Sequence, residues 1–313
     1  MRERIAIIGA GHVGSTAAYA LMLRALFREI VLIDSDGSLA KAEASDLSDA
    51  NALTRPARIW AGTYAEAASA KIAVITAGAA THGQQSRLAV ASQSAAIVSR
   101  CVEQLADAGF NGLILVASNP VDLMTLVAFR RARLPPDRVI GTGTLLDTSR
   151  LRQALAAQLA VAPGSVEGYV LGEHGDSELA AFSTVRVGGL SLEQFTAPHA
   201  GPDLRALATD VKEAGYRIAS GKGYTSFGVA TAIVRICEAV LRDERAVLPV
   251  STLLTGQFGI RDLCLSLPCI LGAAGVERVL LPKLTSAEKL GLTASADVLR
   301  AALAVLDASL TQH

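Results

Sequence analysis

Three charged side chains in the middle of the chain could together move a proton and hold an anion. His174 lies in the glycine-flanked loop 171–177 (LGEHGDS), after an apolar, strand-like segment. Asp147 and Arg150 lie about one turn apart on a predicted helix. An aspartate beside a histidine fixes the tautomer of the ring and stabilises its charged form. The spacing alone does not separate this pairing from a surface histidine and an ordinary Asp147–Arg150 ion pair.

Two polar loops follow predicted strands and could add binding groups. Asn119 comes after the apolar segment 112–117 and before Pro120. Its amide could hold a ribose hydroxyl or a substrate oxygen, or Asn-Pro could simply form a turn. The segment 81–87 contains a glycine and ends in Arg87. It could be a lid that closes with its arginine, or an exposed loop before a helix.

The amino-terminal segment carries the pattern of a dinucleotide-binding turn. Residues 5–14 read IAIIGAGHVG, which is an apolar strand followed by Gly-x-Gly-x-x-Gly and a predicted helix. In this pattern Gly9 permits a tight turn, Gly11 lets the backbone approach a pyrophosphate, and Gly14 lets the helix pack on the strand. The pattern favours dinucleotide binding over a merely tight strand–helix turn.

Asp34 indicates which dinucleotide is bound. It ends the apolar segment VLID, twenty residues after the last glycine of the turn. A carboxylate there accepts hydrogen bonds from the free ribose hydroxyls of NAD and repels the extra phosphate of NADP. We therefore predict NAD as the cofactor, with a preference over NADP of at least about tenfold, or ~1.4 kcal/mol.

Strand and helix patterns alternate through the first half of the chain. Near-continuous apolar strands separated by helices predict a doubly wound parallel sheet of the Rossmann type, with ligands beyond the carboxyl ends of its strands. We assign this NAD-binding domain to residues 1–144. Besides the segments that flank the glycine turn, the expected strands are 57–61, 72–78, 112–117 and 138–141, and the expected helices are 39–47, 87–108 and 122–133.

From about residue 145 the pattern predicts an α+β substrate domain, which we assign to residues 145–313. Helices and strands no longer alternate regularly there, and no flexible linker separates the two parts. The expected helices are 145–160, 203–221, 226–242 and one from 286 onward, and the expected strands are 166–171, 182–187, 246–250 and 262–267.

Composition excludes several classes of protein. The 313 residues are 51% hydrophobic and 19% charged with a formal net charge of zero, which indicates a soluble globular protein without a nucleic-acid partner. No apolar run reaches the ~20 residues of a membrane span, and the first strand begins too early for a signal peptide, so we expect a cytoplasmic protein. Four cysteines, at 101, 237, 264 and 269, lack metal-site spacing, so we expect no metal. Cys264 and Cys269 lie in an apolar stretch and are expected to be buried free thiols.

Taken together and in this order, the motifs resemble the L-lactate/L-malate dehydrogenase family, most of all its bacterial L-lactate members. The resemblance covers nearly the whole chain. It rests on the segments 9–14, 75–79, 86–88, 118–122, 141–147, 171–177 and 222–225. It implies an NAD-dependent L-2-hydroxy acid dehydrogenase, with L-lactate and pyruvate as the first candidate substrates. It also implies a homo-oligomer, a tetramer for lactate-type members and often a dimer for malate-type ones.

The resemblance implies a role for each residue of a hydride-transfer site. His174 resembles the proton donor and acceptor, Asp147 its orienting partner, and Arg150 the clamp on the substrate carboxylate. Arg87 resembles the lid arginine that stabilises charge on the carbonyl oxygen, and Asn119 the ligand of the substrate oxygen or the nicotinamide ribose. Further substrate contacts fall on Thr81 and Thr225. The implied cofactor contacts are Gly9, Gly11, His12, Val13, Gly14, Asp34, Thr76, Ala77, Gly78 and Asn119.

The lid departs from the family pattern at the position that selects the substrate. Thr81, six residues before Arg87, replaces the glutamine of lactate-type members and the arginine of malate-type members. A second substrate carboxylate would lack its cation, which weakens malate. Thr225 is typical of lactate-type members. Malate or a bulkier 2-hydroxy acid remains the enzymatic alternative, and a non-catalytic NAD-binding protein remains the alternative from another class.

A second departure concerns regulation. Family members activated by fructose 1,6-bisphosphate use an arginine and a histidine at a subunit interface. Arg152 matches the arginine, whereas Glu167 stands at the histidine position. Because a carboxylate repels a phosphate, we predict no activation by this sugar phosphate.

Overall fold

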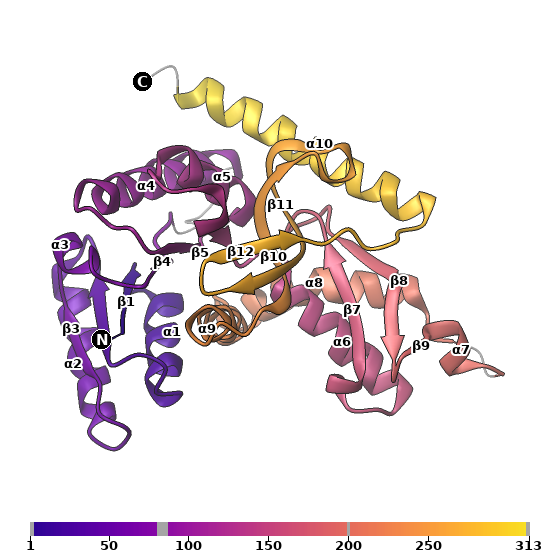
Figure 1. Ribbon diagram of the computed structural model, residues 1–313, viewed down its shortest axis with the longest axis horizontal. Helices are drawn as coiled ribbons and strands as arrows, with labels where there is room; N and C mark the ends of the chain where they lie inside the picture. Colours follow the sequence, from indigo (N-terminus) through magenta and orange to yellow (C-terminus); the bar gives the residue numbers. More distant parts are fainter. Residues whose placement is uncertain (1–2, 80–86, 199–200, 311–313) are drawn as a thin grey trace.

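The computed structural model describes residues 3–79, 87–198 and 201–310, with the side chains at 87–89 and 309–310 excepted. Within these residues a large sheet carries helices on both faces, and a smaller sheet packs beside it (Figure 1). The predicted fold class, a doubly wound Rossmann sheet followed by an α+β part, is confirmed. No helix in the described part of the chain is long and apolar enough to cross a membrane.

Six parallel strands form the first part of the large sheet in the order β3-β2-β1-β4-β5-β6. The chain therefore winds one way from β1 to β3 and the other way from β4 to β6. Ligands of open α/β sheets bind in the crevice at such a reversal, outside the carboxyl ends of the strands. The strands are β1 (Arg4–Ile8), β2 (Glu29–Ile33), β3 (Arg58–Ala61), β4 (Ile72–Ile75), β5 (Leu113–Val116) and β6 (Val139–Gly141).

The apolar residues of β1 bury both faces of the sheet. Ile5 and Ile7 belong to the core cluster on one face, and Ala6 and Ile8 belong to the cluster on the other. This alternation explains why the strand has no polar position. The first face is covered by α1 (His12–Leu23), α2 (Gly37–Asn51) and α9 (Phe227–Leu241), and the second by α4 (Arg87–Asp107), α5 (Val121–Arg131) and α10 (Ser286–Leu310).

Three antiparallel strands from the second half of the chain extend the same sheet to nine strands. They are β10 (Ala246–Thr255), β11 (Arg261–Gly272) and β12 (Gly275–Val279). The junction is the pairing of Ser251 in β10 with Gly141 in β6. A Cβ atom at Gly141 would lie 3.0 Å from the Cβ of Ser251, so glycine lets the two strands approach. The division at residues 144 and 145 stays a prediction, because this sheet runs through both parts.

The smaller sheet forms a hairpin that carries the histidine loop. β7 (Val166–Leu171) and β8 (Leu179–Val187) pair antiparallel, and β9 (Leu190–Ser191) adds a short edge. Together with α6 (Leu145–Leu159) and α8 (Leu204–Lys222) they enclose a third apolar core. Because Leu171 pairs with Leu179, the loop 172–178 is held at the end of this hairpin.

Most expected elements agree with the structure within a few residues, but the last strands do not. β10 and β11 are about twice as long as the predicted segments 246–250 and 262–267. The short elements α3 (Tyr64–Ala67), β9, α7 (Leu192–Thr196) and β12 were not predicted. Short elements carry too few periods for a pattern. All four cysteines are buried and free, as expected for Cys264 and Cys269.

Candidate active site

The glycine turn after β1 is too tight for side chains at two of its positions. Gly9 has a φ of +104°, and a Cβ atom there would lie 2.5 Å from the backbone nitrogen of Ala77. A Cβ atom at Gly14 would contact the carbonyl of Gly9 and lie 2.8 Å from the Thr76 Oγ1. These two glycines let β1, α1 and the end of β4 pack together.

The same turn leaves room for a pyrophosphate in front of α1. A Cβ atom at Gly11 would meet nothing within 4 Å, and no described side chain caps the helix that begins at His12. The first N–H groups of a helix are free to bind an anion when no side chain caps them. The predicted cofactor residues Gly11, His12 and Val13 therefore lie where a dinucleotide phosphate fits.

Asp34 lies at the carboxyl end of β2 beside this turn. Its Oδ2 accepts a hydrogen bond from the Ala10 N–H at 2.7 Å, and its Oδ1 accepts one from the Asp36 N–H at 2.9 Å. The Ser35 hydroxyl also donates to Oδ1 at 3.3 Å, and because a carboxylate has about four acceptor positions, one remains for a ribose hydroxyl. The arrangement fits the NAD site predicted from the sequence.

Hydroxyl groups join the carboxyl ends of the central strands. The Thr76 Oγ1 donates to the carbonyl oxygen of Gly9 at 2.7 Å, and the Ser118 Oγ donates to that of Ala77 at 2.6 Å. Gly78 follows in the same segment, and a Cβ atom there would find only ordinary contacts. Asn119 is exposed at the end of β5, and its peptide bond to Pro120 is cis. The predicted cofactor residues thus lie along one edge of the sheet.

An aromatic contact joins the glycine turn to the segment between α8 and α9. The rings of His12 and Tyr224 stack with centroids 4.0 Å apart and an interplanar angle of 11°. The Lys222 Nζ lies 4.4 Å from the centre of the Tyr224 ring. Thr225, which the family resemblance assigns to the substrate, is the next residue and is half-buried. The sequence analysis missed this contact, because 212 positions separate the two rings.

His174 and Asp147 form a close pair. The Nδ1 of His174 lies 2.6 Å from the Oδ2 of Asp147, which is 1% exposed. The Arg150 Nη1 donates to the other carboxylate oxygen, Oδ1, at 2.8 Å. The two contacts that the sequence left as alternatives therefore exist together. The side chains of His174 and Arg150 are 28% and 18% exposed, so neither is turned out into solvent.

The pair favours a protonated imidazole beside an ionised carboxylate. Burial disfavours the charge on His174, but the Asp147 carboxylate outweighs it and raises the pKa of the ring to about 9. Burial also opposes ionisation of Asp147, but His174 and Arg150 outweigh it and lower the pKa of this carboxyl. Because Nδ1 contacts Asp147, the Nε2 atom is the one left to exchange a proton with a substrate.

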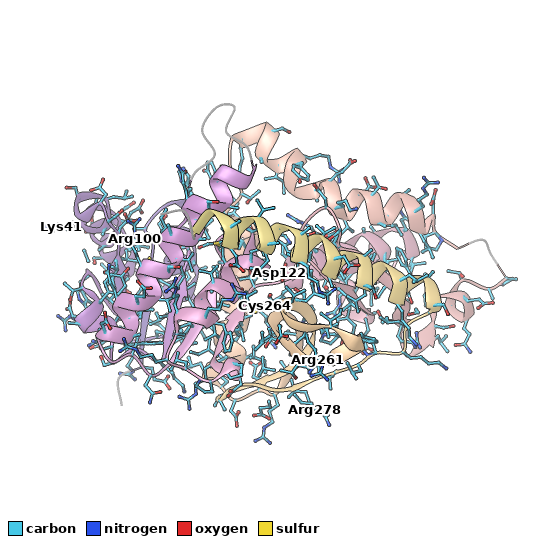
Figure 2. All side chains as sticks on the ribbon, turned by 90° about the horizontal axis from the view of Figure 1, so that it is seen from above. Lys41, Arg100, Asp122, Arg261, Cys264 and Arg278 are labelled. Atoms are coloured by element: carbon cyan, nitrogen blue, oxygen red, sulfur yellow. The ribbon has the colours of Figure 1, made fainter. Side chains whose placement is uncertain are left out.

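Asp122 holds the backbone of the histidine loop. Its Oδ2 accepts a hydrogen bond from the His174 N–H at 2.7 Å, and its Oδ1 accepts one from the Ser251 hydroxyl at 2.6 Å. It is 2% exposed, and Figure 2 labels it near the centre of the view. Burial raises the pKa of this carboxyl to about 6, although both hydrogen bonds lower it. The sequence analysis gave it no role, although it ends the quoted segment 118–122.

Further contacts attach the histidine loop to β11 and α10. Gly172 and Ser266 exchange two backbone hydrogen bonds of 3.0 Å each. The Ser295 Oγ accepts a hydrogen bond from the Glu173 N–H at 2.8 Å. The loop is therefore fixed from three sides, which limits the movement of the His174 ring.

Two predicted lid residues cannot be placed. Thr81 lies outside the described residues. Arg87 is the first residue of α4, and its side chain lies outside the described part as well. Their substrate contacts stay predictions.

Comparison with known proteins agrees along the whole chain. Residues 3–141 match the NAD binding domain of lactate/malate dehydrogenases, and residues 144–308 match their alpha/beta C-terminal domain. The chain belongs to the lactate/malate dehydrogenase family. It is 41% identical to an L-lactate dehydrogenase of Thermus aquaticus, over 97% of this chain and 99% of the relative. It is 37% identical to one of Lacticaseibacillus casei, over 96% and 93% of the two chains.

Solved structures of this dehydrogenase family superpose closely. A minor L-lactate dehydrogenase of Enterococcus mundtii in a ligand-bound form matches with a TM-score of 0.94 at 39% identity, covering 98% of each chain. A lactate dehydrogenase from a deep-sea metagenome library matches with a TM-score of 0.95 at 35% identity, covering 98% of this chain and all of the other. The family is one of NAD-dependent oxidoreductases, and the first domain of this chain is its NAD-binding domain.

Arg152, which the family resemblance matches to a sugar-phosphate ligand, makes contacts within its own chain. The Arg152 Nε donates to the carbonyl oxygen of Gly168 at 3.1 Å, and its guanidinium lies 5.5 Å from the centre of the Tyr169 ring. Glu167 is exposed beside them. The absence of activation by fructose 1,6-bisphosphate stays a prediction.

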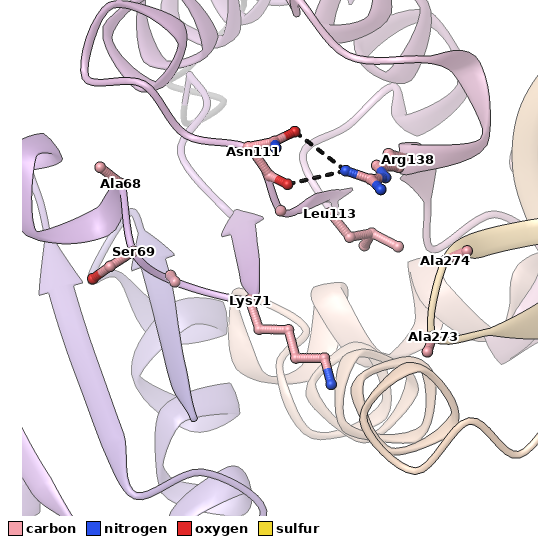
Figure 3. A pocket seen from close by; sticks show the side chains of 10 residues that line it. Ala68, Ser69, Lys71, Asn111, Leu113, Arg138, Ala273 and Ala274 are labelled. Atoms are coloured by element: carbon pink, nitrogen blue, oxygen red, sulfur yellow. Dashed lines mark hydrogen bonds between the residues drawn. The ribbon is translucent and has the colours of Figure 1, made fainter. Parts of the chain in front are cut away.

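A pocket of about 300 Å³ lies at the opposite edge of the dehydrogenase sheet. Figure 3 shows Lys71 and Arg138 on its wall, where Arg138 donates to the carbonyl oxygen and the Oδ1 of Asn111 at 3.1 and 3.2 Å. Lys71 and Arg138 directly precede β4 and β6, so this pocket lies at the amino ends of the strands. The NAD-binding turn and its neighbours follow the carboxyl ends, so we do not assign the pocket to the active site.

Proposed function

We propose that this chain is an NAD-dependent L-lactate dehydrogenase, which interconverts L-lactate and pyruvate. The arrangement that carries the proposal is the contact of Asp147 with both His174 and Arg150, beside the cofactor edge of the sheet. Reduction of a 2-keto acid needs a proton for its oxygen and a cation for its carboxylate, and these two side chains offer them. The L-lactate dehydrogenases among the relatives support this choice of substrate.

Arg150 binds the carboxylate of the substrate. A guanidinium has five donors in a planar fork, and one contact to Asp147 leaves others for a bidentate bond to a carboxylate. Because the same aspartate also contacts His174, the fork and the imidazole keep a fixed distance from each other. The substrate is thereby oriented with its 2-keto oxygen toward the ring.

His174 transfers the proton. In reduction, the Nε2–H gives its proton to the keto oxygen, and the reverse step takes it back from the hydroxyl of lactate. Bound NADH supplies the hydride that reduces the keto carbon. Asp147 holds the ring through Nδ1 and stabilises its charged form, so the proton is present at neutral pH when reduction begins.

The remaining predicted residues would complete the pocket. We propose that Arg87 stabilises negative charge on the keto oxygen and that Asn119 contacts this oxygen or the nicotinamide ribose. Thr81 and Thr225 would face the 2-substituent of the substrate. Because Thr81 brings no positive charge, a second carboxylate would be desolvated without a partner, which favours pyruvate over oxaloacetate.

A panel of 2-keto acids tests the proposal. NADH oxidation is measured with pyruvate, oxaloacetate and 2-ketoisocaproate, for the wild type beside His174→Ala. We expect the largest kcat/KM for pyruvate, and the His174→Ala variant should lose turnover while it still binds NADH. A preference for oxaloacetate or for the branched acid would replace lactate as the substrate. Absence of turnover on all three by the folded wild type would favour a non-catalytic NAD-binding protein.

We further propose that the chain assembles into a homotetramer. The resemblance to lactate-type members, for which the sequence analysis implies a tetramer, supports this proposal. Light scattering would measure the mass directly, and a monomer at micromolar concentration would contradict the proposal. The cytoplasmic location stays a prediction.

A further inference from the structure

A third titratable group, Glu178, lies beside His174 and Asp147. An oxygen of the Glu178 carboxyl, a ring nitrogen of His174 and a carboxylate oxygen of Asp147 all lie within 4.8 Å of one another. Glu178 is half-buried. Among the described residues, no hydrogen bond and no ion pair within 4.0 Å reaches its carboxyl, whereas both oxygens of Asp147 are bonded.

The fold of the histidine loop brings Glu178 to this place. The Glu178 N–H donates to the carbonyl oxygen of Gly175 at 3.1 Å, which closes a turn within the loop. The next residue, Leu179, begins β8 and pairs with Leu171. The turn therefore brings Glu178 near His174, directly before β8 begins at Leu179.

The charges around Glu178 come from three elements. Asp147 and Arg150 face it from α6, and Lys212 faces it from α8. Asp122 on α5 adds a negative charge to the surroundings of His174. Lys212 and Arg150 favour ionisation of Glu178, but neither forms an ion pair with it within 4.0 Å among the described contacts.

Burial and the negative charge of Asp147 raise the pKa of Glu178 to about 8, and His174, Lys212 and Arg150 lower it less. The pKa of His174 is raised to about 9, and Glu178 is one of the negative charges that raise it. Two groups so close that titrate in the same range do not titrate independently. Loss of the proton from Glu178 strengthens the hold of His174 on its own proton.

We propose that Glu178 is a positioning residue of the proton-transfer group, and that its ionised carboxyl keeps His174 protonated at alkaline pH. This inference rests on the proposed reduction of a 2-keto acid by this site. Its consequence is that reduction continues to a higher pH than the pair of His174 and Asp147 alone would allow.

The side chains of Glu178, His174 and Asp147 are of types that bind divalent metals, but their contacts favour a protonated His174 over a bound metal ion. The His174 Nδ1 and the Asp147 Oδ2 are engaged with each other at 2.6 Å. The Arg150 guanidinium lies 2.8 Å from the other Asp147 oxygen, where its positive charge opposes a bound cation.

The charge of Glu178 can be removed without changing its size, by Glu178→Gln. The readout is proton NMR of the His174 ring in the protein without cofactor or substrate. The chain has five histidines, and the signal missing from His174→Asn identifies the one that matters. We expect the His174 titration midpoint in Glu178→Gln to fall by at least about half a pH unit, as a charge near 5 Å in a partly solvated site would cause.

Two further variants separate this effect from a general change of charge. Glu213→Gln removes the same charge from the exposed face of α8 and should leave the midpoint within ~0.2 pH units, since exposed charges are screened. Glu178→Asp keeps a carboxylate and should return the midpoint toward the wild-type value. A folded Glu178→Gln protein with the wild-type midpoint would overturn the inference.

The pH profile of kcat/KM for pyruvate gives a second readout. The alkaline limb of the profile should move to lower pH in Glu178→Gln by the shift seen in NMR, while the plateau at pH 6 changes little. If the wild type reduces pyruvate and neither readout moves, the inference fails and the proposed function stands. If the NMR midpoint moves but no keto acid is reduced, the proposed function fails, and the effect of the Glu178 charge on the protonation of His174 stands.

Discussion

Two regions of the site are built in different ways: the cofactor edge, which contains the glycine turn and Asp34, and the proton-transfer group, which consists of His174, Asp147 and their neighbours. At the cofactor edge, the turn from Gly9 to Gly14 and the carboxylate of Asp34 come from one strand–helix–strand unit, and most contacts are to backbone atoms. In the proton-transfer group, His174 depends on Asp147, 27 positions away, and on Asp122, 52 positions away. The first region is a short-range arrangement of backbone, whereas the second is a set of buried charges that only tertiary packing brings together.

The largest difference between the two regions is expected when the imidazole of His174 is removed. His174→Asn should lower kcat for pyruvate reduction by about 10² to 10⁴-fold, because general acid catalysis is lost. The dissociation constant for NADH, measured by fluorescence, should stay within about twofold of the wild type, because the glycine turn is untouched. Loss of NADH binding in a folded variant would mean that the two regions are not separable as we describe them.

The support of the histidine loop can be tested through Asp122. Asp122→Ala leaves the His174 N–H and the Ser251 hydroxyl without their buried acceptor, which should reduce the free energy of unfolding by about 1–3 kcal/mol. Urea denaturation measures this loss. Asp122→Asn is the matched control and should lose less, because its amide can still accept from the N–H and donate to the hydroxyl. Equal losses in the two variants would show that the hydrogen bonds do not stabilise the loop.

Cofactor choice probes the other region. Because the Asp34 carboxylate is held at the end of β2 by two backbone N–H groups, kcat/KM should be at least about tenfold higher with NADH than with NADPH. The ratio is measured with pyruvate at a fixed pH. Asp34→Ser should reduce the preference, since the repulsion of the extra phosphate is removed. Comparable kcat/KM values for the two cofactors in the wild type would contradict the assignment of Asp34.

The smallest effect is expected from fructose 1,6-bisphosphate. Arg152 contacts Gly168 and Tyr169 of its own chain, and Glu167 repels a phosphate. The sugar phosphate should change the KM for pyruvate by less than about twofold in a steady-state assay. A large fall in this KM would show that the proton-transfer group responds to a distant site despite its fixed contacts.

The fold was predictable from the sequence where a single element carries its own pattern. The strand at residues 5–8 has apolar residues on both faces, and Gly9, Gly11 and Gly14 each have a local mechanical role. The full lengths of β10 and β11 were not predicted, because the two strands pair with each other in ten positions and this pairing carries both of them past the apolar segments that the sequence showed. β12 is five residues long and gave no pattern of its own.

For the candidate site, the family resemblance singled out His174, Asp147 and Arg150, and the structure shows Asp147 in contact with the other two. The residues themselves left open whether Asp147 contacts the histidine or the arginine. Arg150 lies one helical turn away from Asp147, and the sequence does not show how close the loop that carries His174 comes to this helix. Asp122 and Glu178 were missed as neighbours of His174, because an acidic residue in a loop or at a helix start gives no signal of what it will face. Their contacts arise where α5, α6 and the β7–β8 loop meet.

The sequence by itself determined a glycine turn that closes on a dinucleotide and a strand that ends in an acid, because those features need only neighbouring residues and the geometry of the backbone. Tertiary structure decided which carboxylates surround the imidazole of His174 and how far each lies from it. The strength of an interaction between charges depends on distance and on burial, and both are set only when distant segments pack together.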